Sequence, residues 1–156
     1  MGASAIAVGL SLIFAGAILA VSCRRVWLAI SEVRYQRARD EFYRRREWHE
    51  VEFLKLASKN GKPRGLAWKD CEFDDDVAFA RERSTRRLRA FVAVTVSFEA
   101  IEGGGMEHVE AVSNLRAATA VFHYHGRQWT TDGRAVFNLN PAETIQHFRH
   151  ELEMVD

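Results

Sequence analysis

The sequence predicts an α+β protein in which a transmembrane helix continues into a basic helix, followed by a small antiparallel sheet of four to five strands and a C-terminal helix. Three observations predict this order. No charged side chain occurs from Met1 to Cys23, the segment from Arg24 to Ser58 contains neither Pro nor Gly, and apolar side chains alternate with other residues over positions 88–101. These patterns are typical of a membrane helix, a surface helix and a strand, respectively.

The uncharged N-terminal run predicts a membrane anchor over residues 1–23. Roughly 20 apolar helical residues cross a hydrocarbon core of about 30 Å, so the run is long enough. A cleaved signal peptide is less favoured, because no Lys or Arg precedes the apolar residues. The alternative is a lipoprotein with an extracytoplasmic domain, acylated at Cys23, since Leu19–Cys23 loosely resembles a bacterial lipobox. The basic residues that follow Cys23 at once count against it.

The arginines after this run predict its orientation. Eight Arg and three acidic residues lie between Arg24 and Arg46, and basic segments beside a membrane helix remain on the cytoplasmic side. We therefore expect a single pass through the cell membrane, with Met1 outside and the C-terminal domain in the cytoplasm. The residues expected at the bilayer interface, in contact with anionic lipid headgroups, are Arg24, Arg25, Trp27, Arg34 and Arg37.

Charge is distributed unevenly along the chain. Residues 24–64 carry 12 Lys or Arg and 6 Asp or Glu, whereas residues 65–156 carry 10 and 15. An acidic domain repels phosphate, so nucleic acid is not an expected partner. We expect a basic juxtamembrane helix over residues 24–58 and a linker over residues 59–65, where Gly61 and Pro63 end the helix.

Residues 66–156 are predicted to form the small α+β domain. The clearest strand has one apolar face, which consists of Leu88, Ala90, Val92, Val94, Val96 and Phe98. Further strands are expected over residues 77–83, 115–124, 127–131 and 134–139. The sequence Asn140-Pro141-Ala142-Glu143 predicts a helix that begins with Asn140 as its cap, and Ile145, Phe148 and Leu152 give this helix one apolar stripe.

Few residues indicate chemistry. His123 and His125 share one side of a strand and, together with His108, are candidate metal or ligand contacts. Exposed histidines at a hairpin end are the simpler interpretation, because Gly126 indicates a turn there. Asp74-Asp75-Asp76 is interpreted as an acidic turn, and acidic neighbours disfavour the thiolate of Cys71. We expect no cofactor, and the absence of a catalytic motif favours a protein that is not an enzyme.

The sequence therefore favours a single-pass membrane protein whose small cytoplasmic domain binds a partner protein or a second copy of itself. The alternative is a small-ligand-binding or weakly enzymatic domain, in which a curved sheet covered by helices encloses a pocket. Cystatin-like and nuclear-transport-factor-like folds do so, and the comparison is one of fold alone. An apolar pocket with convergent polar groups would favour this alternative, and a solid core would count against it.

Overall fold

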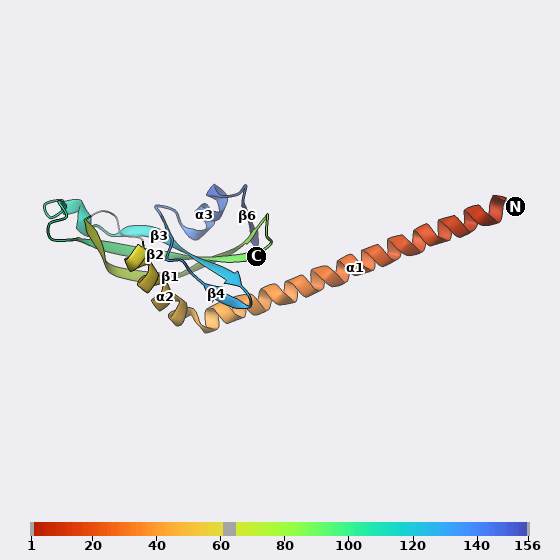
Figure 1. Cartoon of the computed structure of the whole chain (residues 1–156), viewed down its shortest axis with the longest axis horizontal. Helices are drawn as coiled ribbons and strands as arrows, with labels where there is room; N and C mark the ends of the chain where they lie inside the picture. Colours follow the sequence, from red (N-terminus) through yellow and green to blue (C-terminus); the bar gives the residue numbers. More distant parts are fainter. Residues whose placement is uncertain (1, 61–64, 156) are drawn as a thin grey trace. The chain divides into compact units, whose positions relative to one another are not determined.

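The computed structural model describes residues 2–60 and 65–155 (Figure 1). Side chains at positions 2–13, 15, 28, 60, 111 and 113 lie outside the description. The elements are α1 (Gly2–Arg44), α2 (Arg46–Asn60), β1 (Leu66–Glu82), β2 (Leu88–Ala100), the 3-10 helix η1 (Glu110–Ser113), β3 (Arg116–His125), β4 (Gln128–Thr130), β5 (Ala135–Phe137), α3 (Pro141–His147) and β6 (Leu152–Val155). The chain forms two compact units, Met1–Asp40 and Glu41–Asp156, and each is described by itself.

The predicted membrane span over residues 1–23 is contradicted by the structure. Within the described part of the chain, no helix combines the length and the apolar character needed to cross a bilayer. Charged side chains follow Cys23 within helix α1. The prediction of a single-pass protein of the cell membrane, with Met1 outside and a cytoplasmic domain, is therefore wrong.

The helical segment after residue 24 is interrupted at Arg45, where the sequence predicted continuity. The backbone N–H of Arg45 is shared between the carbonyls of Glu41 and Phe42, at 3.2 and 3.3 Å, and α2 begins at the next residue. The guanidinium of Arg46 then donates to Glu50 at 2.7 Å and to Asp75 at 3.0 Å. These bonds tie the start of α2 to β1. Residues 61–64 of the predicted linker lie outside the described residues, so that boundary stays a prediction.

The sheet confirms the α+β class and its antiparallel character, with six strands rather than four to five. The strand order is β4-β3-β2-β1-β6, and β5 pairs with β3 beyond the end of β4. All of these pairs are antiparallel. The additional strand is β6, formed by residues that the sequence assigned to the C-terminal helix.

Strand β1 is longer than predicted because it continues through the three aspartates. Phe73 lies opposite Val94 and Val77 lies opposite Val92, so four steps along β1 match two steps along β2. The surplus residues form a bulge, with the side chains of residues 74–76 exposed. The acidic run is therefore a bulge within a strand and not a turn that ends one.

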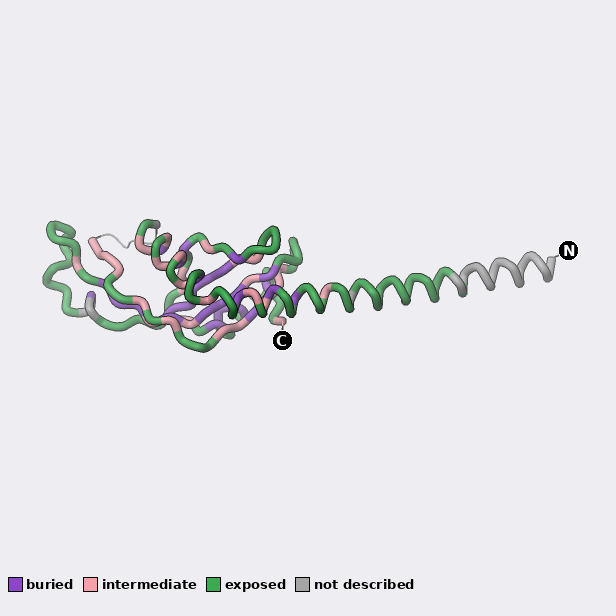
Figure 2. Tube along the Cα trace, turned by 90° about the horizontal axis from the view of Figure 1, so that it is seen from below, coloured by how far each residue is buried: buried purple, intermediate pink, exposed green. Residues whose placement is uncertain are grey.

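The two faces of the sheet are covered by different helices, with α2 on one face and α3 on the other (Figure 1). The predicted apolar face of β2 is confirmed, since all six of its residues are buried. The opposite face carries Arg89 and Phe91, and Phe91 is buried under α3 with Val121 and Ile145. Figure 2 shows the buried stretches gathered along the strands.

The core between α2 and the sheet is aromatic and filled. The Phe42 ring lies 5.7 Å from Phe79, 5.4 Å from Phe122 and 5.0 Å from Trp129, measured between centroids. Phe53 of α2 continues the cluster, at 5.9 Å from Phe122. Edge-to-face contacts of this kind add to the free energy gained from burial. This side of the sheet is a solid core.

One core residue is a histidine whose ring makes no hydrogen bond to the described residues. His49 is 3% exposed, stacks on Phe42 at 5.4 Å, and neither ring nitrogen has a partner among the described residues. Burial, and then the charge of Arg45, lower the pKa of His49 against the opposing effect of Glu41. The folded protein therefore holds the neutral ring, whereas the unfolded chain takes up a proton below a pH of about 6.5. Stability is fully present above that pH and is lost as the pH falls.

We expect His49→Phe to raise the free energy of unfolding at pH 7.5 by about 1–2 kcal/mol, because two buried polar atoms without partners are removed. The variant should also lose less stability than the parent between pH 7.5 and pH 5.5. Urea unfolding at both pH values measures the two effects. His123→Gln is the comparison for the effect at pH 7.5: burial also lowers the pKa of His123, so this variant should lose less stability than the parent at acid pH, but it should not gain stability at pH 7.5, because its half-exposed ring retains water contact. If His49→Phe lost as much stability as the parent between pH 7.5 and pH 5.5, the assignment of the pH effect to a buried, neutral His49 would be contradicted.

Candidate functional site

A cavity of about 160 Å³ lies between α3 and the sheet, on the face opposite the aromatic core. It is lined by Arg89, Phe91, Val121, Arg134, Val136, Thr144, Phe148, Glu151 and Leu152. Five of these residues are apolar and four are polar, namely Arg89, Arg134, Thr144 and Glu151. Polar groups that converge on one cavity can fix the orientation of a bound molecule.

The strand pairing positions the first polar group. Arg89 of β2 lies directly opposite His123 of β3, two residues from the pair formed by Phe91 and Val121. Because side chains alternate along a strand, all four side chains lie on the face that α3 covers.

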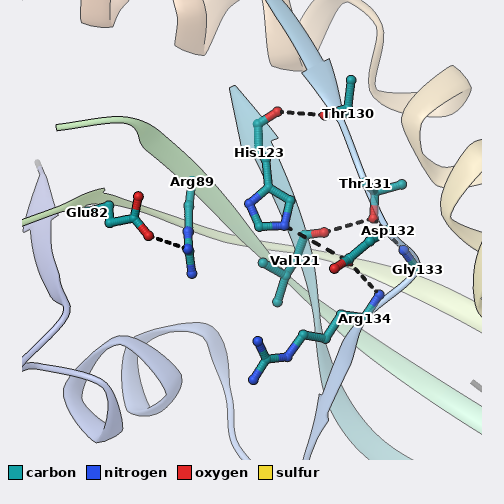
Figure 3. A network of polar contacts seen from close by, with 9 residues as sticks. All are labelled: Glu82, Arg89, Val121, His123, Thr130, Thr131, Asp132, Gly133 and Arg134. Atoms are coloured by element: carbon teal, nitrogen blue, oxygen red, sulfur yellow. Dashed lines mark hydrogen bonds and ion pairs between the residues drawn. The ribbon is translucent and has the colours of Figure 1, made fainter. Parts of the chain in front are cut away.

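A tight turn positions the second arginine (Figure 3). The Gly133 N–H donates to the Thr131 hydroxyl, and the Arg134 N–H donates to the Asp132 carboxylate, both at 3.0 Å. The Thr131 hydroxyl in turn donates to the carbonyl of Val121 at 2.9 Å. The turn is therefore fastened to β3, and Figure 3 shows the Arg134 side chain extending from it below His123.

Arg89 is already neutralised. Its guanidinium lies 2.5 Å from the Glu82 carboxylate, and both side chains are mostly buried. A hydrogen bond from Thr85 is the main effect that lowers the pKa of Glu82, with the charges of Arg89 and Arg87 acting in the same direction. Glu82 is therefore ionised near neutral pH and holds Arg89 at the cavity wall.

Arg134 carries a positive charge that no carboxylate side chain neutralises in the described residues. Its guanidinium carbon lies 5.9 Å above the ring of Phe148, the residue that follows α3. A cation over an aromatic face is attracted to it while its N–H groups stay available as donors. Glu151 also lines the cavity, with an exposed side chain. The groups that line the cavity therefore comprise two cations and one anion.

The helix covering the cavity begins as the sequence predicted. The Glu143 N–H donates to the Asn140 side chain at 2.8 Å, and the Asn140 N–H donates to the Glu143 carboxylate at 3.0 Å, which completes a capping box. The helix ends at His147, earlier than predicted. Leu152 belongs to strand β6 instead, and it packs in the same buried cluster as Ile145 of α3.

Thr144 supplies an unusual polar group at this site. It lines the cavity, has no exposed surface, and its hydroxyl has no hydrogen-bond partner in the described part of the chain. A buried hydroxyl without a partner costs about 1–3 kcal/mol. A bound group that supplied an acceptor would remove this cost.

His123 lies beside this cavity as a neutral ring. Burial is the largest effect that lowers the pKa of His123, and Arg89 and Arg134 add to it against the opposing charges of Asp132 and Glu82. Its Nε2 atom lies 3.9 Å from the Asp132 carboxylate. The ring is therefore unprotonated near neutral pH and does not increase the positive charge.

The three histidines singled out in the sequence are not brought together. His125 ends β3 two residues after His123, while His108 lies beyond the other end of β2, in a groove with Lys69 and Glu99. Ten residue steps along β2 separate Arg89, which lies opposite His123, from Glu99, and this corresponds to about 33 Å. Among the side chains that the structure describes, no three His, Cys, Asp or Glu residues lie close enough together to hold a metal ion.

The remaining candidates lie outside the cavity. Burial, followed by the charge of Glu50, raises the pKa of Cys71 to about 12, so its thiol stays protonated. The residues predicted to contact lipid are exposed on α1, and that contact stays a prediction; they are Arg24, Arg25, Trp27, Arg34 and Arg37. Cys23 is exposed on the same helix, and its acylation is untested.

Sequence reasoning missed Arg134 and Thr144. Arg134 was assigned to a strand, and Thr144 lies one position before the Ile145 of the recognised apolar stripe. A Thr at a buried position of an otherwise apolar helix face was the available signal. Comparisons with protein-family models, with curated proteins and with solved structures gave no match to this chain. The function is therefore argued from the site alone.

Proposed function

We propose that the unit Glu41–Asp156 is a small-ligand-binding domain whose site is the cavity beneath α3. The observation that supports this function best is the fully buried Thr144 hydroxyl, which has no partner among the described residues at a cavity also lined by two arginines. A protein that only needed a stable core would gain by having Val at this position. Retaining the hydroxyl costs stability, and a bound acceptor would recover that cost.

The proposal differs from the pocket considered from sequence. In a cystatin-like or nuclear-transport-factor-like arrangement, the pocket would lie between the sheet and its long helix. That space is filled here by the aromatic cluster around Phe42 and Phe122. The cavity lies on the opposite face, under the short helix α3. The proposed function is binding, and the expectation that the chain lacks catalytic activity stays a prediction.

The test is a binding screen on the full chain labelled with ¹⁵N. Small neutral, anionic and cationic molecules are added in turn, and amide shifts are followed at Phe91, Val121 and Thr144. We expect at least one class of compound to move these signals together. Thr144→Val, which keeps the shape of the side chain, should weaken that binding while raising stability in the absence of ligand. A screen in which no compound moves these signals would overturn the proposal.

Protein interaction is the second candidate, and exposed apolar residues on α2 favour it. Trp48 is 59% exposed and Val51 65% exposed, and Tyr43 of α1, 43% exposed, lines one groove with Trp48. Exposed aromatic side chains near arginines are enriched at protein interfaces. Sedimentation velocity at increasing concentration tests self-association, with Trp48→Ser as the matched variant. A sedimentation coefficient independent of concentration would exclude a second copy as the partner.

A further inference from the structure

The charge, the donors and the volume of the cavity identify a class of ligand, and this inference rests on the proposed function. We propose that the site binds a small aliphatic monocarboxylate. The carboxylate would contact Arg134 and the Thr144 hydroxyl, and the aliphatic tail would lie on the apolar floor. Each part of this assignment follows from a separate property of the lining residues.

The charge of the site favours one negative group. Arg89 is neutralised by Glu82 at 2.5 Å, so Arg134 is the cation left to bind an anion at the cavity. Glu151 lines the cavity as well and repels a second negative charge. A monoanion is therefore accommodated, whereas a dicarboxylate or a phosphate dianion would leave one charge without a partner.

The donors favour a carboxylate among monoanions. A guanidinium presents parallel N–H groups whose spacing matches the two oxygens of a carboxylate. The Thr144 hydroxyl, which lacks an acceptor, adds one donor to the site. The Phe148 ring lies 5.9 Å from the Arg134 guanidinium carbon and attracts the cation.

The volume and the floor favour a short aliphatic tail. The cavity measures about 160 Å³, and an apolar protein cavity of about 150 Å³ holds a molecule the size of benzene. A ligand with about six non-hydrogen atoms is therefore expected. The floor is formed by Phe91, Val121, Val136 and Leu152, which offer no hydrogen bond from their side chains.

The experiment compares three compounds of equal size in calorimetric titrations of the full chain at pH 7.5. Butanoate, butanamide and pentylammonium each have about six non-hydrogen atoms, and they differ in the charge of the head group. We expect butanoate to bind about tenfold or more tightly than butanamide, because hydrogen bonds to charged groups are stronger. Pentylammonium should not bind measurably.

Three variants assign the contacts. Arg134→Gln should weaken butanoate binding about tenfold or more, and Arg134→Lys should recover only part of it, because an ammonium lacks the paired donors. Thr144→Val should weaken binding about fivefold. Glu151→Gln is the matched control and should strengthen binding, since it removes a negative charge from the same cavity.

The outcomes separate this inference from the proposed function. If butanamide or pentylammonium binds as tightly as butanoate, with the same amide shifts at Phe91 and Val121, the carboxylate assignment is overturned and the binding function stands. Equal affinity in the parent and in Arg134→Gln also overturns it. If none of the three compounds binds and the wider screen is negative, both proposals fail.

Discussion

Replacing Phe42 with alanine is expected to lower the free energy of unfolding by about 3–5 kcal/mol, the range for large-to-small changes at buried aromatic positions. Phe42 is 1% exposed. It lies in the last turn of α1, and its ring packs against Phe79, Phe122 and Trp129 of the sheet. Those aromatic rings are held by the strands and cannot collapse into the space that the smaller side chain would leave. Urea unfolding followed by tryptophan fluorescence measures the loss.

Trp48→Ala is the matched control for Phe42→Ala. Trp48 lies nearby in α2 but is 59% exposed, and its edge contacts His49 at 5.7 Å. Its removal should cost less than about 1 kcal/mol, as is usual for exposed side chains. Equal losses in the two variants would show that the aromatic cluster is not the main core of the unit.

Replacing Gly133 with alanine is expected to cost about 3 kcal/mol or more. Gly133 is buried at φ +75°, and an added Cβ would lie 2.6 Å from the carbonyl carbon of Leu56 and 2.9 Å from the Cα of Ala57. Both atoms belong to the main chain of α2 and cannot turn aside. Urea unfolding measures the loss of stability, and amide shifts at Arg134 report any movement of the turn.

Gly126→Ala separates the clash from the backbone conformation. Gly126 also has a positive φ, +57°, but an added Cβ would meet no atom within 4 Å. This variant should therefore cost only about 1 kcal/mol, the penalty for a left-handed conformation. If both substitutions cost the same, the approach of the turn to α2 is not tight in solution.

Much of the fold could be predicted because it depends on local patterns. The alternation from Leu88 to Phe98 determines a strand with one buried face, and it does so without knowledge of its partners. Asn140, Pro141 and Glu143 predict a helix start because a capping box is formed by neighbours in sequence. These two features were confirmed with their residues.

The errors arose where distant residues decide the structure. The run Asp74–Asp76 has the composition of a turn, but pairing with β2 carries the strand through it as a bulge. Leu152 fits a helical stripe, but its pairing with Glu82 places it in β6. The apolar N-terminal run predicted a span from composition, and the described helix α1 does not provide one.

The candidate site could not be predicted as a unit. Arg89, Arg134 and Thr144 are contributed by β2, by the segment before β5 and by α3. Only the return of α3 onto the sheet brings these three side chains to one cavity. Their individual sequence patterns are those of a half-buried strand, a loop and a helix, so no short motif predicts that they line one cavity.

The alternation of β2 also divides its positions into two sets for protein engineering. Even-numbered positions from Leu88 to Phe98 belong to the aromatic side of the sheet, and odd-numbered Arg89 and Phe91 face α3. A library that varies Arg89 would therefore sample new pocket chemistries while the buried residues on both faces of β2 are kept. Variation at the even-numbered positions would instead mostly yield unfolded chains, because all six side chains are buried. Neighbouring residues of this one strand are therefore expected to be under different selection, one for ligand contact and the next for stability.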